Sequence, residues 1–312
     1  MQIKSVLRKL GSNSLLDRSS YLYSTLRKNQ ITRSRQRFER NLKRAPQSPQ
    51  WLDQQALKFL NRQYPVLTGK LDAHASTSEN RSKSRASRIL TFISEAAALN
   101  KLNDCLELGC GDGMVSYFMH TQGKNTTAID SYSEGFSKRA TEAGVNCIAM
   151  DAASLQFDSE SFDFVFSYDS FEHFADPQRV LQEATRVLRP GGYIYLDFEP
   201  LYMSPFGLHS WELVNIPYCH LLFPTEMLQN FVGEKGHEFF SKVDTAINQW
   251  RLKQFRSLWQ QFSDRLKTAD YQEIYTIKHL GLIHQYPDVF TSKTDLFDDL
   301  ICSRIQAILQ KI

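Results

Sequence analysis

The stretch LELGCGDG, residues 106–113, constrains the fold of this chain more than any other. An apolar run over 104–108 ends in three glycines spaced two residues apart, and 114–122 follows with helical apolar spacing. This order predicts a strand, a tight glycine loop and a helix. Glycines reach positive φ without strain and let a ligand lie against bare backbone. Because the first N–H groups of a helix have no partner within it, the loop is suited to a polar ligand.

Strands and helices alternate regularly after this loop. Strands are predicted at 104–108, 125–129, 146–150, 162–168 and 193–198, and helices at 114–122, 133–143 and 177–188. This alternation indicates an α/β fold with a doubly wound, mostly parallel sheet and helices on both faces. Segments 273–277 and 305–309, with a helix between them, are predicted to complete a seven-stranded sheet. Ligands of such sheets bind at the carboxyl ends of the strands.

The charge of the chain is distributed unevenly. Residues 1–50 hold twelve Lys and Arg against Asp17 and Glu39, so this part carries +10 and the remainder −7. We therefore predict a basic helical N-terminal extension over 1–85 and a catalytic domain over 86–312, with a substrate-side insert at 199–270. Within the extension, residues 51–64 are predicted to form a helix. The Ser-rich segment 74–87 is predicted to be a loop or a mobile flap.

Three interpretations of the basic segment 1–45 stay open. Ile3, Leu7, Leu10, Tyr21, Leu22 and Leu26 have rough helical spacing among the basic residues. The segment could be a solvated, partly helical leader that packs on the domain, or an arm that binds a membrane surface or phosphates. The third interpretation is a cleaved transit peptide, which is likewise rich in Arg and Ser.

Cysteine usage and hydropathy predict a cytoplasmic protein, with peripheral membrane association through the basic arm as the alternative. The five cysteines include no C-x-x-C pair, which fits reduced thiols and neither a disulfide framework nor a zinc site. No apolar stretch approaches the ~18 residues needed to span a bilayer. No uncharged segment follows the first lysine at the length that a secretory signal requires.

The glycine loop and four later segments together carry a family resemblance. The loop reads E-x-G-x-G-x-G from Glu107 to Gly113, and Asp130 ends the second strand. Asp151 and Ala152 follow the third strand, SYDSFEHF (167–174) follows the fourth, and VLRPGG (187–192) precedes the fifth. In this order the segments resemble the class I S-adenosylmethionine (SAM)-dependent methyltransferases, with a methyltransferase type 11-like domain, over 104–198.

The resemblance implies a Rossmann-like methyltransferase fold that binds SAM. It places Asp130 on the ribose hydroxyls, Asp151 on the adenine amino group and Glu107 near the methionine end. The implied SAM-binding residues are Glu107, Gly109, Gly111, Gly113, Asp130, Ser131, Asp151, Ala152 and Ser167. The alternatives that the residues leave open are a glycine turn without a ligand and aspartates that only cap helices.

Candidate bases for methyl transfer are histidines near the ends of the fourth and fifth strands. We name His209 first, because it lies in the irregular insert that should cover the acceptor, and His173 second. Asp169 and Glu172 are candidate acids that would orient the histidine base. His220 is predicted to be a core residue. No H-x-x-x-H pair or carboxylate run is present, so no metal is predicted.

The predicted function is transfer of a methyl group from SAM to a small-molecule or lipid-like acceptor, at a hydroxyl. Four aromatic residues of the insert, Tyr202, Phe206, Trp211 and Tyr218, suit a planar or apolar acceptor, although core packing explains them equally well. One alternative is an RNA- or ribosome-directed enzyme that holds phosphates with its basic arm. The other is a non-catalytic SAM-binding partner protein. The expected partners are the acceptor and a membrane surface rather than nucleic acid.

Overall fold

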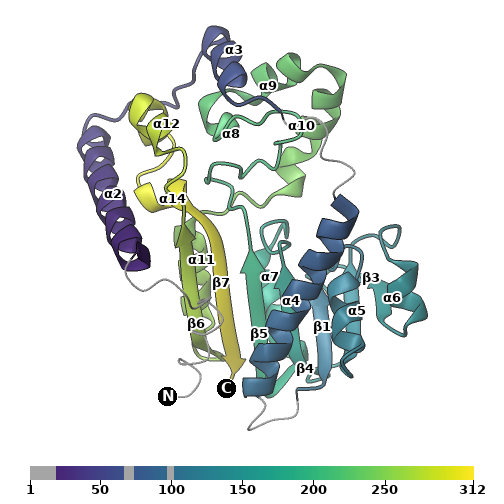
Figure 1. Cartoon of the computed structure of the whole chain (residues 1–312). Coiled ribbons are helices and arrows are strands. Elements are labelled where there is room, and N and C mark those ends of the chain that lie inside the picture. The colour runs from purple at the N-terminus through teal and green to yellow at the C-terminus, as the bar shows by residue number, and fades with distance from the viewer. Residues whose placement is uncertain (1–18, 67–73, 97–101) are drawn as a thin grey trace.

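A seven-stranded sheet lies at the centre of the computed structural model, which describes residues 19–66, 74–96 and 102–312 (Figure 1). The strand order is β3-β2-β1-β4-β5-β7-β6, and only the β5–β7 and β7–β6 pairs are antiparallel. The strands are β1 (Asp104–Leu108), β2 (Asn125–Asp130), β3 (Asn146–Ala149), β4 (Phe162–Tyr168), β5 (Leu188–Phe198), β6 (Leu266–Tyr275) and β7 (Cys302–Lys311). The predicted doubly wound, mostly parallel sheet is confirmed.

Alternate residues of the central strands are buried on opposite faces of the sheet, as the two-residue period of a strand requires. Phe164 and Tyr193 face α4 (His74–Ala96) and α5 (Met114–His120). Val165 and Ile194 belong to the core on the other face, together with residues of α7 (Pro177–Val187) and α11 (Leu252–Gln261). Helix α6 (Lys138–Glu142) lies beside β3 at the edge of the sheet.

A helical lobe lies beyond the carboxyl ends of the parallel strands (Figure 1). Its helices are α2 (Ser19–Leu42), α3 (Gln54–Gln63), α8 (Cys219–Leu222), α9 (Thr225–Val232), α10 (Glu234–Ala246), α12 (Leu280–Gln285), α13 (Pro287–Thr291) and α14 (Phe297–Ile301). They share one apolar core that includes Leu57, Tyr218 and Phe290. The lobe therefore combines the N-terminal segment with two segments that follow β5 and β6.

The basic helix α2 is part of this lobe. Phe38 is buried against Phe297 of α14, and Arg35 forms an ion pair of 2.6 Å with Asp298. Arg27 donates a hydrogen bond to the backbone carbonyl of Tyr275. For residues 19–42 these contacts support the interpretation of a helix that packs on the domain. The predicted apolar positions at Ile3, Leu7 and Leu10 lie outside the described residues.

The predicted loop over 74–87 is wrong, because these residues belong to the continuous helix α4. Ser82, Ala86, Ile89 and Ile93 are buried at spacings of four, three and four, which is one face of a helix. A serine and an alanine occupy the first two of these positions, so the stretch lacks the large apolar residues that make a helix visible in a sequence. The predicted boundary at 85/86 consequently falls inside α4.

The helix predicted over 133–143 is shorter, and two strands begin earlier than predicted. Strand β6 begins at Leu266, inside the insert predicted for 199–270. Strand β5 begins at Leu188, the last residue of the predicted helix, because Leu188 pairs with Phe162. Among the described residues, every helix is too short or too polar to cross a membrane.

Candidate active site

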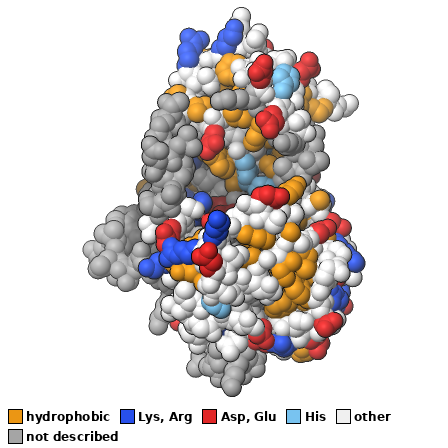
Figure 2. Space-filling view, turned by 90° about the vertical axis from the view of Figure 1, so that its right-hand side faces the viewer, with side chains coloured by type: hydrophobic (Ala, Val, Ile, Leu, Met, Phe, Trp, Pro, Cys, Tyr) orange, Lys and Arg blue, Asp and Glu red, His pale blue; other side chains and the backbone are white. Residues whose placement is uncertain are grey.

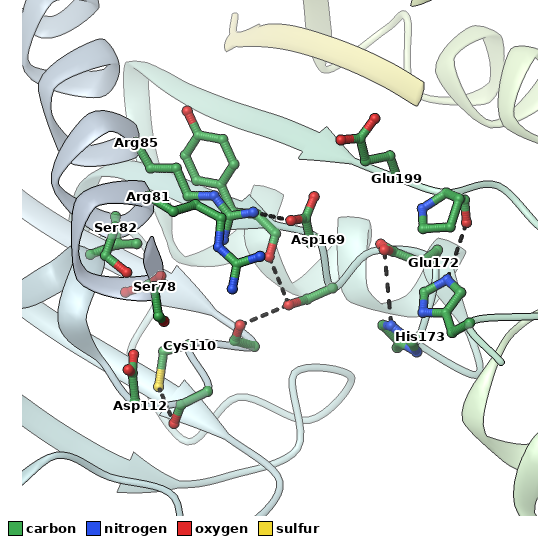
Figure 3. A pocket seen from close by; sticks show the side chains of 18 of the residues that line it. Ser78, Arg81, Ser82, Arg85, Cys110, Asp112, Asp169, Glu172, His173 and Glu199 are labelled. Atoms are coloured by element: carbon green, nitrogen blue, oxygen red, sulfur yellow. Dashed lines mark hydrogen bonds and ion pairs between the residues drawn. The ribbon is translucent and has the colours of Figure 1, made fainter. Parts of the chain in front are cut away.

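Two adjoining pockets lie at the carboxyl ends of β1, β2 and β4. The first, which we call the β2–β3 pocket, has a volume of about 380 Å³. The second, the α4 pocket, has a volume of about 500 Å³ and lies between α4, the glycine loop and the insert after β5 (Figure 3). Gly109, Ser170 and His173 line both pockets. The two pockets therefore meet at the first glycine of the loop.

The glycine loop has the backbone that its sequence predicts. Gly109, Gly111 and Gly113 have φ of 68°, 57° and 73°. The backbone N–H of Gly111 donates to Asp130 Oδ2 at 2.8 Å, which ties the loop to the end of β2. Gly113 precedes α5 and lines neither pocket; a Cβ there would lie 3.3 Å from the Cys147 sulfur. Its role is therefore in the turn, whereas Gly109 and Gly111 line the α4 pocket.

Asp130, Ser131, Asp151 and Ala152 all line the β2–β3 pocket. Neither aspartate caps a helix. Asp130 ends β2 and holds the Gly111 amide, and the Ser131 hydroxyl lies 3.4 Å from its other carboxylate oxygen. Asp151 is exposed, and its Oδ1 accepts the Ala153 N–H at 2.8 Å within a turn. The structure thus brings these four residues together.

Glu107 is buried beneath the glycine loop and lines the α4 pocket. Its Oε2 accepts hydrogen bonds from the Ser116 hydroxyl at 2.6 Å and from the Ser116 N–H at 3.1 Å. Burial raises the pKa of the Glu107 carboxyl to about 8, because an ionised carboxylate is poorly solvated there; the two hydrogen bonds from Ser116 oppose this shift. A cation bound in the pocket would therefore favour the ionised form of the Glu107 carboxyl.

Ser167 does not line either pocket. Its side chain is fully buried within the sheet, and its hydroxyl donates to the backbone carbonyl of Leu108 at 2.9 Å. The structure thus gives the Ser167 side chain a role in joining β4 to the end of β1, and corrects the expectation that this side chain faces a ligand.

Helix α4 supplies basic residues that the sequence reading missed. Arg81 and Arg85 line the α4 pocket, and Figure 3 shows both reaching across it from the helix. Arg85 forms an ion pair with Asp169 and lies 5.0 Å from the centre of the Tyr168 ring. Burial lowers the pKa of Arg85 from its ordinary value. Recognition of the 82-86-89-93 spacing would have placed this helix, and hence its arginines, on the sheet.

The structure brings His173 and His209 together in the wall of the α4 pocket, beside its junction with the β2–β3 pocket. Their ring centroids lie 4.8 Å apart in an edge-to-face arrangement, and Figure 2 shows histidine side chains in the hollow between the helical lobe and the sheet. Burial lowers the pKa of His209 to about 4; the charge of His173 adds to this and the bond to the Pro200 carbonyl opposes it. At neutral pH His209 is therefore an uncharged imidazole with a lone pair.

Glu172 lies in the same wall. Its carboxylate is buried, with Oε1 3.9 Å from His173 Nε2 (Figure 3). Burial raises the pKa of this carboxyl to about 8, and the neighbouring charge of Glu199 adds to the shift. One donor atom each from Glu172, His173 and His209 lies within 4.8 Å of the others. The sequence alone predicts Glu172 only as an orienting acid.

The aromatic insert contributes less to the pocket than its composition suggests. Trp211 lines the α4 pocket. Tyr218 is buried against Phe290, and its hydroxyl donates to the Leu300 carbonyl at 2.9 Å. Tyr202 packs on His220, which is buried as predicted, and Phe206 packs on His279. Core packing therefore accounts for Tyr202, Phe206 and Tyr218.

Comparison with known proteins gives the family of the central region. A family model described as "Methyltransferase domain" matches residues 106–196. That range contains the glycine loop, both pocket aspartates, and the segment with Glu172 and His173. Residues 106–196 form a class I SAM-dependent methyltransferase domain.

Curated relatives are similar to this chain over about a third of its length. A fatty-acid O-methyltransferase of Mycolicibacterium smegmatis is 37% identical over 113 residues, which are 34% of this chain and 40% of that protein. A phthiotriol/phenolphthiotriol dimycocerosates methyltransferase of Mycobacterium tuberculosis is 38% identical over 101 residues, 30% of this chain and 37% of that protein. The 27-O-demethylrifamycin SV methyltransferase of Amycolatopsis mediterranei is 33% identical over 113 residues, 34% and 42% of the two chains. The chain spans about two fifths of the length of these relatives.

The methyltransferase family implies use of SAM, and the site can accommodate such a molecule. A Cβ on Gly109 would lie within 2.5 Å of Ser170 Cβ, so the loop passes the junction of the pockets as bare backbone. Carboxylates border both pockets, and a carboxylate accepts paired hydrogen bonds from vicinal hydroxyls. The junction at Gly109 therefore suits an elongated polar cofactor with one end in each pocket.

Proposed function

We propose that this chain is a SAM-dependent O-methyltransferase that acts at a hydroxyl of a small, lipid-like molecule. The observation that carries the proposal is the junction of the two pockets at Gly109 and His173. The β2–β3 pocket carries the side chains suited to a nucleoside. The α4 pocket carries the groups suited to an amino-acid tail and to activation of an acceptor.

In this proposal SAM spans the junction. Asp130 accepts hydrogen bonds from the ribose hydroxyls, Asp151 accepts one from the adenine amino group, and Ala152 contacts the adenine ring. Its amino-acid tail lies in the α4 pocket, where Glu107 offers a carboxyl to the ammonium group and Arg81 a guanidinium to the carboxylate. Placement of each charged end beside an opposite charge supports this orientation.

Methyl transfer from a sulfonium is an in-line displacement at an already activated carbon. The acceptor oxygen forms the new O–CH₃ bond while the S–CH₃ bond breaks and its electron pair returns to sulfur. The hydroxyl proton leaves the acceptor. Alignment of the two reactants supplies up to ~7–11 kcal/mol in favourable cases. Activation of the hydroxyl adds about 10²–10⁴-fold, and His209 and His173 are the groups that we assign to it.

The class of acceptor follows from the wall opposite the glycine loop and from the relatives. Trp211, Pro200 and His209 give this wall an apolar surface with polar nitrogen atoms. Two of the relatives named above are described as acting on a fatty acid and on a demethylrifamycin, in both cases at oxygen. A hydroxylated molecule with a substantial apolar part is the acceptor that suits both observations.

The test is methyl transfer from SAM labelled in its methyl group. The chain is incubated with a panel of long-chain hydroxy acids, phenols with alkyl tails and a lipid extract, and labelled products are identified by mass spectrometry. We expect a labelled methyl ether, abolished in Asp130→Ala and retained in His237→Ala, which changes an exposed histidine of α10. SAM binding without transfer to any acceptor would favour the non-catalytic alternative.

We also propose that the exposed basic face of α2 contacts an anionic membrane surface that holds such an acceptor. Lys28, Arg33 and Arg40 are exposed, whereas Phe38 is committed to the core of the lobe. Contact through α2 is therefore electrostatic and is weakened by salt. The variant in which these three residues become Glu should lose flotation with phosphatidylserine vesicles. Unchanged flotation, or steeply salt-dependent binding to RNA instead, would contradict this.

A further inference from the structure

We propose that Glu172, His173 and His209 form a binding site for one divalent transition-metal ion, of which Zn²⁺ is the best match. The site lies in the wall of the α4 pocket, and His173 also lines the adjoining β2–β3 pocket. The ion-binding claim rests on these three residues alone. The role we give the ion below rests on the proposed function.

The first argument is the convergence of three donors from two distant segments. Glu172 and His173 follow β4, and His209 comes from the insert after β5. One ligand atom from each lies within 4.8 Å of the other two, and His173 Nε2 lies 3.9 Å from Glu172 Oε1. Small side-chain movements would bring these atoms to the ~2 Å distance from zinc that histidine nitrogen and carboxylate oxygen adopt.

The second argument is the buried carboxylate itself. Both oxygens of Glu172 are buried, and neither has a hydrogen-bond partner among the described residues. A buried carboxyl group without a hydrogen-bond partner is costly, and structures rarely keep one without a purpose. A cation bound at Oε1 would give the carboxylate a partner. The two neighbouring imidazoles can bind the same cation through their nitrogen atoms.

The backbone around the three residues is well anchored, so the convergence is built into the fold. The Asn248 N–H donates to the Glu172 carbonyl, and the Asn248 side-chain amide donates to the Phe171 carbonyl, each at 2.9 Å. The His173 N–H donates to the Ser170 carbonyl, also at 2.9 Å. These bonds join the segment that carries Glu172 to Asn248, which precedes α11, and to Ser170, which contacts Gly109 of the glycine loop.

His209 has the second contact that metal-binding histidines usually make. Its Nε2 lies 3.3 Å from the Pro200 carbonyl oxygen, which can only accept, so Nε2 carries the hydrogen. The Nδ1 lone pair is then left for an ion, and the carbonyl fixes both the tautomer and the ring orientation. Two imidazoles and one carboxylate form the set of three protein ligands, with an open position, that is typical of catalytic zinc.

The open position would face the α4 pocket, where the proposed function places the acceptor. An acceptor hydroxyl bound there loses its proton to solvent more readily, because the ion stabilises the alkoxide. The alkoxide oxygen then forms the O–CH₃ bond as the S–CH₃ bond breaks and sulfur takes the electron pair. His173 and His209 thus activate the acceptor through the ion and not as free bases.

The binding test uses the full chain stripped with a chelator and titrated with Zn²⁺ and, separately, with Co²⁺. We expect one ion per chain by calorimetry and elemental analysis. Bound Co²⁺ should absorb visible light, and this absorption should disappear when Zn²⁺ displaces the Co²⁺. His209→Ala and Glu172→Gln should each weaken binding by at least about 100-fold, because loss of a residue that only hydrogen-bonds to a metal ligand already costs about 10–100-fold. His237→Ala and Glu212→Gln, which change exposed residues away from the pocket, should bind as the unchanged chain does.

The outcomes separate this proposal from the proposed function. If the unchanged chain binds no ion, or if Co²⁺ gives no displaceable absorption, the metal site is refuted whatever the variants do. If SAM binding and methyl transfer persist in excess chelator, the role of the ion is refuted while the methyltransferase assignment stands. If the ion binds but SAM does not, the proposed function fails and the metal site stands.

Discussion

Ser170 occupies the space that a side chain on Gly109 would need. A Cβ on Gly109 would lie 2.5 Å from Ser170 Cβ and 2.7 Å from Ser170 Oγ, and that hydroxyl already donates to the Gly109 carbonyl at 2.7 Å. The end of β1 and the segment after β4 are therefore locked together where the two pockets meet.

This contact predicts the effect of Gly109→Ala. Left-handed backbone at a non-glycine residue costs about 1–2 kcal/mol, and the overlap with Ser170 adds about 1–3 kcal/mol. We expect a loss of unfolding free energy of about 3 kcal/mol in urea titrations, together with loss of SAM binding. Gly123→Ala is the matched control, since Gly123 also has positive φ but has open space around it. Equal destabilisation of the two variants would contradict the role of Ser170.

Asp130 provides a second prediction, which concerns the ribose. If its carboxylate accepts hydrogen bonds from both ribose hydroxyls, Asp130→Ala should weaken SAM binding by more than about 100-fold, because hydrogen bonds to charged groups are worth about 1.5–3 kcal/mol each. Asp130→Asn keeps an oxygen for the Gly111 amide and should lose less. The affinities are measured by calorimetry, with the exposed Asp264→Ala as control. An unchanged affinity in Asp130→Ala would remove Asp130 from the site.

Glu107 predicts a pH dependence of cofactor binding. Its carboxyl, with a pKa of about 8, is largely protonated below that pH, and a bound ammonium group favours the ionised form. Binding of SAM should therefore release a proton, and the affinity should rise by up to tenfold per unit as the pH increases from about 6 toward 7.5. Calorimetry in buffers of different ionisation enthalpy measures the proton. Glu107→Gln should abolish the release; its persistence would assign the proton to another group.

The same carboxyl predicts a stability effect with a definite sign. The folded-state pKa of Glu107 lies above the unfolded value of 4.5, so its stability contribution is complete below 4.5 and is lost as the pH rises toward 8. In the absence of SAM, Glu107→Gln should gain stability relative to the unchanged chain as the pH rises from 5 to 8. Urea titrations across this range check the slope, and parallel curves would contradict the assignment.

The buried ion pair between Arg304 and Asp197 should contribute to the stability of the sheet. Asp197 on β5 is fully buried, and Arg304 on β7 donates two hydrogen bonds to its carboxylate. Arg304→Met leaves that carboxylate with Gln306 as a remaining donor, so we expect a loss of about 3 kcal/mol in urea unfolding. Arg265→Met, beside exposed Asp264, should cost at most about 1 kcal/mol. Comparable effects would show that the buried pair contributes no more than a surface one.

The central sheet was predictable because its signals are local. Runs such as 162–168 are long enough for a buried strand, and glycines mark the turns, so β1 and β4 match the predicted ranges. The pocket aspartates follow from their place at strand ends. The first half of helix α4 was not predicted because Ser82 and Ala86 occupy its buried face, and such small residues give only a weak apolar period.

The acceptor side of the site was less predictable because it depends on contacts between distant segments. His209 and Glu172 are separated by an irregular insert, and nothing in their local sequence shows that they share one wall of a pocket. The sequence also does not show which aromatic residues of the insert line the pocket, because this too depends on contacts between distant segments. Tyr218 and Trp211 look alike in composition, yet one is buried in the lobe and the other lines the pocket.

The measurement that most directly tests the central claim is a calorimetric titration of the full chain with SAM, repeated with Asp130→Ala. The account predicts one SAM per chain, bound at the junction of the two pockets, with binding strongly reduced in the variant. Absence of binding to the unchanged chain, or binding that Asp130→Ala leaves intact, would contradict the assignment of this site to SAM.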